Sequence, residues 1–493
     1  MDSPQETVGL GDIKLIQAGM GVGVSSWKLA NKTARHQGVL GTISGVAAEN
    51  IVTRTLQRGD LGGHFRRALE AFPFPAIARQ IIEKYFISGG IPPGQKFRAH
   101  PVFNLKPSKE LQQLMVACEF ALVWLAKEGH RGLISVNYLE KIQIPHIWYL
   151  LGAMLAGINV VTMGAGIILQ IPSVIESLAS GTNPHYKVDV VSFNRSGVVG
   201  DESTIADITY CPEELLGGEI PPLKRPQLLA IVSGNFLAKV LLKKCPGQIA
   251  GFVVEYPTAG GHNAPPRGKE KRFNKKGEPL YAEEVGGKDW VDLADFKKIK
   301  DAQNIPFWLA GSYGSPEGMS KALQVGANGI QVGSAFALSD DSGILSHLRD
   351  MARYLGYQGS LEVLRTLRSP TGYPFNIAQL AGTMSDDELY SERKRSCAIC
   401  ALRVPYQKDG KVEGYRCSAE PIANWVRKGG KEKEAENAIC LCNGLLATIG
   451  LGNPGELPVV TLGQSLDFLP HLMKDEYDTY TADDVVAYLL QNV

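Results

Sequence analysis

One histidine lies in a stretch of the chain where few other side chains could do chemistry. Residues 253–268 read VVEYPTAGGHNAPPRG, in which an apolar run stops at Glu255 and His262 follows two glycines. A neutral imidazole near pH 7 can take a proton from a carbon acid. The glycines would let the backbone pass close to a flat ligand. We therefore interpret His262 as a candidate catalytic residue, with a plain loop hydrogen bond as the alternative.

Glycine–serine pairs follow two other apolar runs. Gly311-Ser312 and Gly333-Ser334 offer free backbone N–H groups and hydroxyl donors without a bulky side chain. Such groups bind phosphate at the end of barrel strands and at helix N-termini. A glycine after a strand is usually only a turn, so neither pair alone predicts a site. Together they predict a phosphate-binding edge.

Five of the eight cysteines fall within residues 397–442. Their spacing is C-x₂-C, a single cysteine, and then C-x-C: Cys397, Cys400, Cys417, Cys440 and Cys442. Thiolates at these intervals could bind zinc or an iron–sulfur cluster, in which at most four of the five would be ligands. Reduced cysteines packed in a core are the alternative. The spacing is irregular, and the sequence leaves both interpretations open.

Eight short β-branched runs could position these candidate residues. Amphipathic stretches such as 315–325 lie between several of the runs, which favours parallel pairing. Eight such units predict an α/β fold, a closed (β/α)₈ TIM barrel whose active site lies at the carboxyl ends of the strands. A ninth run, 187–193, belongs in this interpretation to an insertion. The eight runs are 14–18, 39–43, 133–137, 159–163, 228–232, 250–255, 306–310 and 329–332.

A dinucleotide-binding Rossmann sheet is the alternative fold. Residues 19–23 read GMGVG directly after the first run. The third glycine of that fingerprint should stand at position 24, which is Val24. No acidic residue ends a strand about 20 residues later. The barrel is therefore the preferred interpretation.

The pattern also predicts how the chain divides. The barrel should span residues 1–340, and residues 341–493 should form a mostly helical extension that contains the cysteine-rich segment 397–442. One insertion carries RGKEKRFNKKG (267–277), with six basic residues and one acid, which is either a solvated loop or a contact for a phosphate-bearing substrate or carrier. The barrel insertions are expected at about 46–130, 164–226 and 264–304.

Composition excludes some classes of function. The formal net charge of +1 gives no argument for nucleic acid or an acidic membrane. Residues 145–175 lack Asp, Glu, Lys and Arg, but they divide into a helix, a strand and a new helix start near Pro172, which favours a buried α/β unit over a membrane span. The N-terminus has no signal-peptide pattern. We expect a cytoplasmic protein with reduced cysteines, and the oligomeric state is left open.

Four motifs, in this order, resemble those of a known flavin-dependent family. The chain is similar to the nitronate monooxygenase family, formerly called 2-nitropropane dioxygenases, which includes FMN-dependent enoyl-acyl-carrier-protein reductases. The resemblance covers about residues 10–340 and not the C-terminal third. The motifs are IQAGMG (16–21), VEYPTAGGHNA (254–264), WLAGSYGSPEGM (308–319) and GANGIQVGSAF (326–336).

The resemblance implies that FMN is the cofactor and that His262 faces the substrate. It implies that the phosphate is held by four residues of the third and fourth motifs, Gly311, Ser312, Gly333 and Ser334. It places the isoalloxazine ring against or near six further residues, Ala18, Gly19, Met20, Asn137, Gly260 and Gly261.

Four departures from the family pattern bear on these implications. Ser312 stands where the family has glycine, and Ser334 where it has threonine. Ala335 replaces an arginine, and Ala264 replaces a glycine two residues past the histidine. Phosphate binding tolerates these changes more easily than substrate identity does.

The resemblance therefore implies an FMN-dependent oxidoreductase. Its first form is a nitronate monooxygenase-like enzyme that oxidises a small acidic-carbon substrate with O₂, with His262 as base or substrate binder. The second is an NAD(P)H-dependent 2-enoyl-thioester reductase, whose partner would be an acyl carrier protein or a CoA thioester. The third is an FMN-binding component of a larger assembly with a metal-stabilised C-terminal region.

Overall fold

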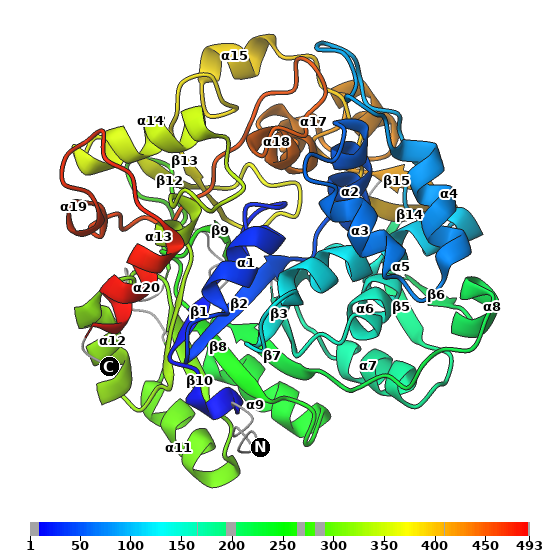
Figure 1. Ribbon diagram of the computed structural model, residues 1–493. Coiled ribbons are helices and arrows are strands. Elements are labelled where there is room, and N and C mark those ends of the chain that lie inside the picture. Colours follow the sequence, from blue (N-terminus) through cyan, green and yellow to red (C-terminus); the bar gives the residue numbers. More distant parts are fainter. Residues whose placement is uncertain are drawn as a thin grey trace.

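The computed structural model describes residues 9–164, 166–193, 204–263, 272–281, 291–408 and 410–491 (Figure 1). Within these residues, eight parallel strands close into a barrel in the order β1-β11-β10-β8-β7-β4-β3-β2. Every neighbouring pair is parallel, as expected of strands joined by helical connections. The strands are β1 Leu15–Gln17, β2 Val39–Ser44, β3 Ile134–Leu139, β4 Val160–Gly164, β7 Gln227–Val232, β8 Gly251–Glu255, β10 Phe307–Ala310 and β11 Gly329–Val332.

The barrel confirms the α/β TIM-barrel prediction, because each of the eight expected runs forms one of its strands. The Rossmann alternative is wrong, since a closed barrel has no open sheet on which a dinucleotide crevice could form. The run 187–193 lies outside the barrel, in β5 (His185–Phe193), as its placement in an insertion predicted.

Apolar side chains fill the barrel interior. One buried cluster takes its members from strands all around the barrel, among them Ile16, Leu40, Leu229, Val253 and Trp308. Side chains alternate between the two faces of a strand, so residues two positions further along point the same way. This period places Glu255 on the interior face, two residues after Val253 and at the carboxyl end of β8.

Helices surround the barrel on the outside. Local sequence sets their starts: α12, for example, begins with Pro316 at its first position, and the Ser315 Oγ accepts a hydrogen bond from the Gly318 N–H at 3.0 Å. The surrounding helices are α1 Trp27–Thr33, α5 Lys109–Lys127, α6 His146–Leu155, α7 Ile171–Ala179, α9 Asn235–Lys244, α11 Leu293–Gln303 and α12 Pro316–Gln324.

The last helix of the chain completes this ring. After β11, the chain forms only the short α13 (Ser334–Ala337) before it leaves the barrel. It returns at α20 (Ala482–Leu490), which contacts α1, α12, α13 and β1. Figure 1 shows α20 in red beside the blue α1 and the green α12. α20 is therefore part of the barrel wall, although it lies in the segment that was expected to form a separate extension after residue 340.

The insertions and the extension form small layers on the barrel. The first insertion adds α2 Ala48–Gln57, α3 His64–Glu70 and α4 Pro75–Tyr85, and the second adds β5, β6 Thr204–Thr209 and α8 Pro212–Leu216. The extension is mostly helical, as predicted, and contains the cysteines. Its helices are α14 Ser346–Tyr357, α15 Asp387–Glu392, α16 Ile422–Arg427, α17 Glu432–Glu436, α18 Leu441–Thr448, α19 Leu469–Leu472 and α20.

The extension also contributes strands to two small sheets. One sheet has the order β12-β13-β9, in which β12 (Val363–Thr366) and β13 (Phe375–Ala378) pair with β9 (Gly261–His262) of the barrel segment. The other has the order β15-β14-β5-β6, with β14 Val404–Lys408 and β15 Lys411–Arg416. Both sheets attach the extension to connections that leave the barrel strands.

The uncharged segment 145–175 forms α6, β4 and the start of α7, as the helix–strand interpretation predicted. Among the residues that the structure describes, no helix combines the length and the apolar character needed to cross a membrane.

Candidate active site

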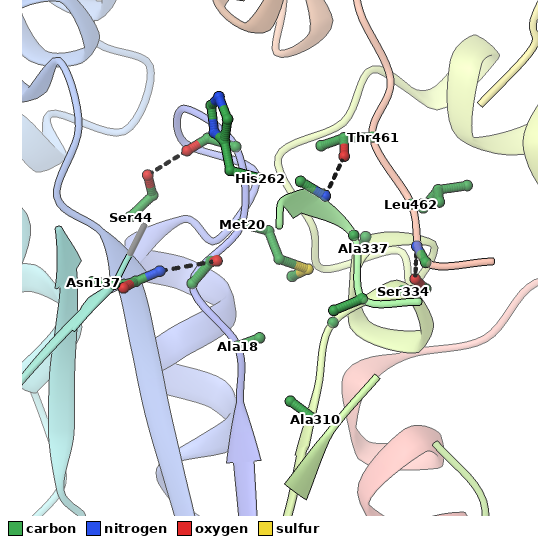
Figure 2. Close-up of a pocket in the computed structure, with 18 of the residues that line it drawn as sticks. Ala18, Met20, Ser44, Asn137, His262, Ala310, Ser334, Ala337, Thr461 and Leu462 are labelled. Atoms are coloured by element: carbon green, nitrogen blue, oxygen red, sulfur yellow. Dashed lines mark hydrogen bonds between the residues drawn. The ribbon is translucent and has the colours of Figure 1, made fainter. Parts of the chain in front are cut away.

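A cavity of about 230 Å³ opens at the carboxyl ends of the barrel strands. All eleven residues that the sequence nominated for flavin binding and catalysis line it. Figure 2 shows Ala18, Met20 and Asn137 on one side and Ser334, Thr461 and Leu462 on the other. We call the nominated strand tips the rim: residues 18–20, 260–262, 311–312 and 333–334.

The loop after β1 is held by a buried serine. The Ser25 hydroxyl donates to the Ala18 carbonyl oxygen at 2.6 Å and accepts from the Met20 N–H at 3.0 Å. A Cβ added at Gly19 would lie only 2.2 Å from the Asn137 Cβ, so Asn137 packs directly against this glycine. The loop therefore presents mainly backbone and one flexible Met20 side chain to the cavity.

Asn137 leaves an unused acceptor at the cavity. Its Nδ2 donates to the Gly19 carbonyl oxygen at 3.2 Å, whereas its Oδ1 is buried and has no hydrogen-bond partner among the described residues. A buried amide oxygen without a donor is costly. A ring N–H of a bound flavin would supply that donor, so this residue fits the predicted cofactor.

The predicted phosphate edge has the required backbone geometry. Gly311 and Ser312 have positive φ angles of 90° and 61°, the left-handed conformation that favours glycine. This explains why the related motif has glycine where this chain has Ser312. The Ser334 hydroxyl oxygen accepts from the Gly463 N–H at 2.7 Å, so its own hydrogen is available as a donor. Backbone amides and two hydroxyl groups at one edge fit a phosphate.

His262 sits on the short strand β9 rather than in an open loop. Its Nε2 lies 2.7 Å from the Ser369 Oγ, and its ring packs edge-on against Phe375 with 4.7 Å between centroids. Burial lowers the pKa of His262 to about 4. The imidazole is therefore neutral at pH 7, as the sequence analysis assumed, but it is a weaker base than an exposed histidine.

Glu255 is another titratable group of the cavity and was not among the site residues predicted from the sequence. It ends β8 opposite Ala310 of β10 and projects into the barrel interior. Burial raises the pKa of Glu255 to about 8. A signal existed in the sequence, because an apolar strand that ends in a carboxylate at a catalytic face is a candidate site.

The extension closes the cavity from the other side. Phe375 of β13 and three further segments of the extension line the cavity, and we call these three segments the cover: 399–402, 441–445 and 461–468. The Gly261 N–H donates to the Thr461 Oγ1 at 2.7 Å, and a Cβ added at Gly260 would approach the Leu462 carbonyl carbon to 3.0 Å. The rim and the cover are thus in direct contact (Figure 2).

The five clustered cysteines lie in and beside the cover. The Cys397 Sγ is 3.2 Å from the Cys400 Sγ, Cys417 and Cys440 pack in one small cluster, and Cys442 lines the cavity. Burial raises the pKa of the Cys417 and Cys442 thiols to about 12. In the described chain, no group of three or more His, Cys, Asp or Glu side chains is arranged to hold a metal ion. The zinc or iron–sulfur centre therefore gains no support and stays a prediction.

The basic segment 267–277 is described only from Arg272 onward, because residues 264–271 lie outside the described residues. There, the Asn274 Oδ1 accepts hydrogen bonds from the Lys276 and Glu278 N–H groups, and Lys276 pairs with Glu362 of the extension. A role of this segment in binding a carrier stays a prediction.

The fold and the cavity together define a (β/α)₈ barrel with a ligand site at the carboxyl ends of its strands, where barrel enzymes carry their active sites. Neither a protein-family model nor a curated protein matches the chain. Solved structures do resemble it at low identity.

Three of these structures are compared with the chain. FabK from Thermotoga maritima is 12% identical with a TM-score of 0.42, over 97% of this chain and 92% of its own. A nitroalkane oxidase from Streptomyces ansochromogenes is 12% identical with a TM-score of 0.42, over 97% and 95%. The enoyl reductase domain of MlnA from the macrolactin cluster of Bacillus amyloliquefaciens is 11% identical with a TM-score of 0.45, over 97% and 95%. TM-scores this low carry no conclusion about the activity of this chain.

Proposed function

We propose that the protein is an FMN-dependent oxidoreductase. The observation that carries the proposal is the convergence of the rim, because tips of strands far apart in the sequence border one cavity. The unpaired Asn137 Oδ1 and the left-handed backbone at Gly311 and Ser312 support it. When bound, FMN would supply the electron-transfer chemistry that no protein side chain provides.

The chain's own residues would then bind and orient. Backbone amides of the phosphate edge, with the Ser312 and Ser334 hydroxyls, would hold the phosphate, and Asn137 would accept a hydrogen bond from the ring. His262 would orient the substrate through the ring nitrogen that Ser369 does not engage. The cover would exclude water with the apolar side chains of Leu402, Leu445 and Leu462.

The first candidate reaction is the oxidation of a small nitronate with O₂. The resemblance of the four motifs supports it, and the low basicity of His262 suits a substrate that arrives already deprotonated. In this reaction, the neutral imidazole would donate a hydrogen bond to the nitro oxygen rather than remove a proton.

The second candidate is the reduction of a 2-enoyl thioester with NAD(P)H. One observation favours it: none of the described residues that line the cavity is a lysine or an arginine that could neutralise a nitronate. The arginine of the related motif is Ala335 here. An uncharged acyl chain fits such a lining. The thioester would be carried by an acyl carrier protein or coenzyme A.

Two assays on one preparation test these proposals. The purified protein is first reconstituted with FMN and its visible spectrum recorded. O₂ consumption with propyl nitronate is then compared with NADPH oxidation with crotonyl-CoA. Turnover in the first assay supports the nitronate reaction, and turnover in the second supports the reductase. Flavin binding without either activity would favour an FMN-binding component of a larger assembly, and failure to bind FMN would contradict the proposed function.

A further inference from the structure

Glu255 occupies a position that neither candidate reaction has used. The interior of the barrel is apolar around it: Ala310 is its register partner on β10, and Ile231 lies on the neighbouring β7. No hydrogen-bond donor or cation among the described residues contacts its carboxyl group. A carboxyl group with no protein partner, at the floor of a cavity, is available to whatever fills that cavity.

We propose that Glu255 is the proton-transfer residue of this site, a carboxylic acid that hydrogen-bonds the ligand ring and gives it a proton on reduction. The inference rests on the proposed function. If a two-electron donor, the substrate or a nicotinamide, reduced a bound flavin, the Glu255 O–H bond would break and its proton would go to a ring nitrogen. When a hydride then passed to O₂ or to the enoyl group, that ring nitrogen would return its proton to the Glu255 carboxylate, and water would supply the second proton of the product.

Other titratable groups at the cavity are less suited to this role. His262 engages Ser369, and burial keeps it neutral. The Tyr138 hydroxyl donates to Glu119 at 2.9 Å. Cys442 is a thiol whose pKa burial raises to about 12. Tyr313 is a phenol whose ring packs against Tyr256 with 5.9 Å between centroids. Gln331 and Asn137, which also line the cavity, do not titrate.

Burial sets the protonation state that the proposal needs. Because burial raises the pKa of Glu255 to about 8, the group is a neutral acid at pH 7 and becomes a carboxylate above pH 8. A ligand that accepts a hydrogen bond from the acid binds more weakly once the proton is lost. In Glu255→Gln, the amide N–H₂ keeps a donor at every pH.

The test is FMN binding by the apo-protein, measured by fluorescence titration between pH 6.5 and 9.5. For the wild type, we expect the FMN dissociation constant to rise with pH above the pKa of Glu255, with a limiting slope of about tenfold per pH unit. For Glu255→Gln, we expect wild-type affinity at pH 7 and a flat profile. Glu119→Gln is the matched control, because burial also raises the pKa of Glu119 to about 8 but this residue does not line the cavity. It should keep the wild-type profile.

A second measurement uses the wild type alone, so it remains informative even if the Glu255→Gln variant fails to fold. Calorimetry of FMN binding at pH 8.5, in two buffers with different heats of ionisation, should detect uptake of a proton by the complex. FMN binding with no proton uptake, or a Glu255→Gln profile that still follows pH, would overturn the role of Glu255 and leave the proposed function standing. Absence of FMN binding at every pH would overturn both.

Discussion

The rim and the cover enclose one cavity but line it with different kinds of chemical groups. The rim is mostly backbone, glycine and small side chains at the ends of barrel strands. The cover is mostly apolar side chains from segments that lie between residues 399 and 468. Backbone groups are well suited to bind a cofactor, whose structure does not vary, whereas side chains distinguish one substrate from another. The comparison assigns cofactor binding to the rim and substrate selection to the cover.

The largest expected effect is a packing failure in the rim. In Gly19→Ala, the new Cβ would overlap the Asn137 Cβ, at a separation of 2.2 Å. We expect the free energy of unfolding to fall by about 3 kcal/mol, the upper end for an overpacked site. Urea denaturation measures it. Gly11→Ala is the control, because no atom of the residues that the structure describes lies within 4 Å of a Cβ there. Equal stability of the two variants would show that Asn137 does not pack on Gly19.

The next effect separates the cavity from the protein around it. A Cβ at Gly261 meets no atom of the described residues within 4 Å, so Gly261→Ala adds a methyl group that points into open space at the cavity. We expect FMN affinity to fall about tenfold, which corresponds to about 1.4 kcal/mol. Gly157→Ala shares the positive φ and the open surroundings but lies outside the cavity. It should lose the same backbone stability and keep its FMN affinity, and a loss of affinity in both variants would refute a specific role for Gly261.

The contact between rim and cover gives a smaller effect. Thr461→Val removes the acceptor of the Gly261 N–H and the donor to the Asn376 carbonyl oxygen, both at 2.7 Å. We expect a loss of about 1–2 kcal/mol in the free energy of unfolding, because a half-buried N–H is left unpaired. The Michaelis constant for the substrate should rise more than the dissociation constant for FMN. A change confined to FMN affinity would contradict the division of labour between rim and cover.

The smallest effect is a gain. Ser312 has a φ of 61°, which strains any residue with a Cβ. In Ser312→Gly, we expect the free energy of unfolding to rise by about 0.5–1 kcal/mol, as measured by urea denaturation. The fall in FMN affinity should be no larger than the contribution of the one hydrogen bond that the serine hydroxyl makes. A less stable Ser312→Gly variant would show that the serine side chain makes a contact worth more than the strain.

The same comparison explains what the sequence could predict. The eight strands and the rim residues follow from local patterns, because a β-branched run that ends in Gly311-Ser312 or Gly333-Ser334 carries its own signal. The nominated residues line one cavity because a closed barrel brings its strand ends together. Glu255 was within reach of the same reasoning.

The cover could not be predicted in this way. Thr461 and Leu462 reach the cavity, and Ser369 reaches His262, only because β13 pairs with β9 and the chain passes back over the rim. Such long-range pairing leaves no periodic pattern in the sequence. The packing of α20 on the barrel could not be predicted for the same reason, because the amphipathic pattern of a helix does not indicate which surface the helix packs against. The cysteine spacing predicted a metal centre. Among the described residues, no group of three or more His, Cys, Asp or Glu side chains is arranged to hold one, so the metal centre stays a prediction.

The central claim is that the rim holds FMN by its phosphate at Gly311, Ser312, Gly333 and Ser334. Parallel titrations of the apo-protein with FMN and with riboflavin, which lacks the phosphate, test it most directly. The account predicts that FMN binds about 100-fold or more tightly than riboflavin, because charge-assisted hydrogen bonds from several donors are lost together. Equal affinity for the two flavins, or binding of neither, would contradict it.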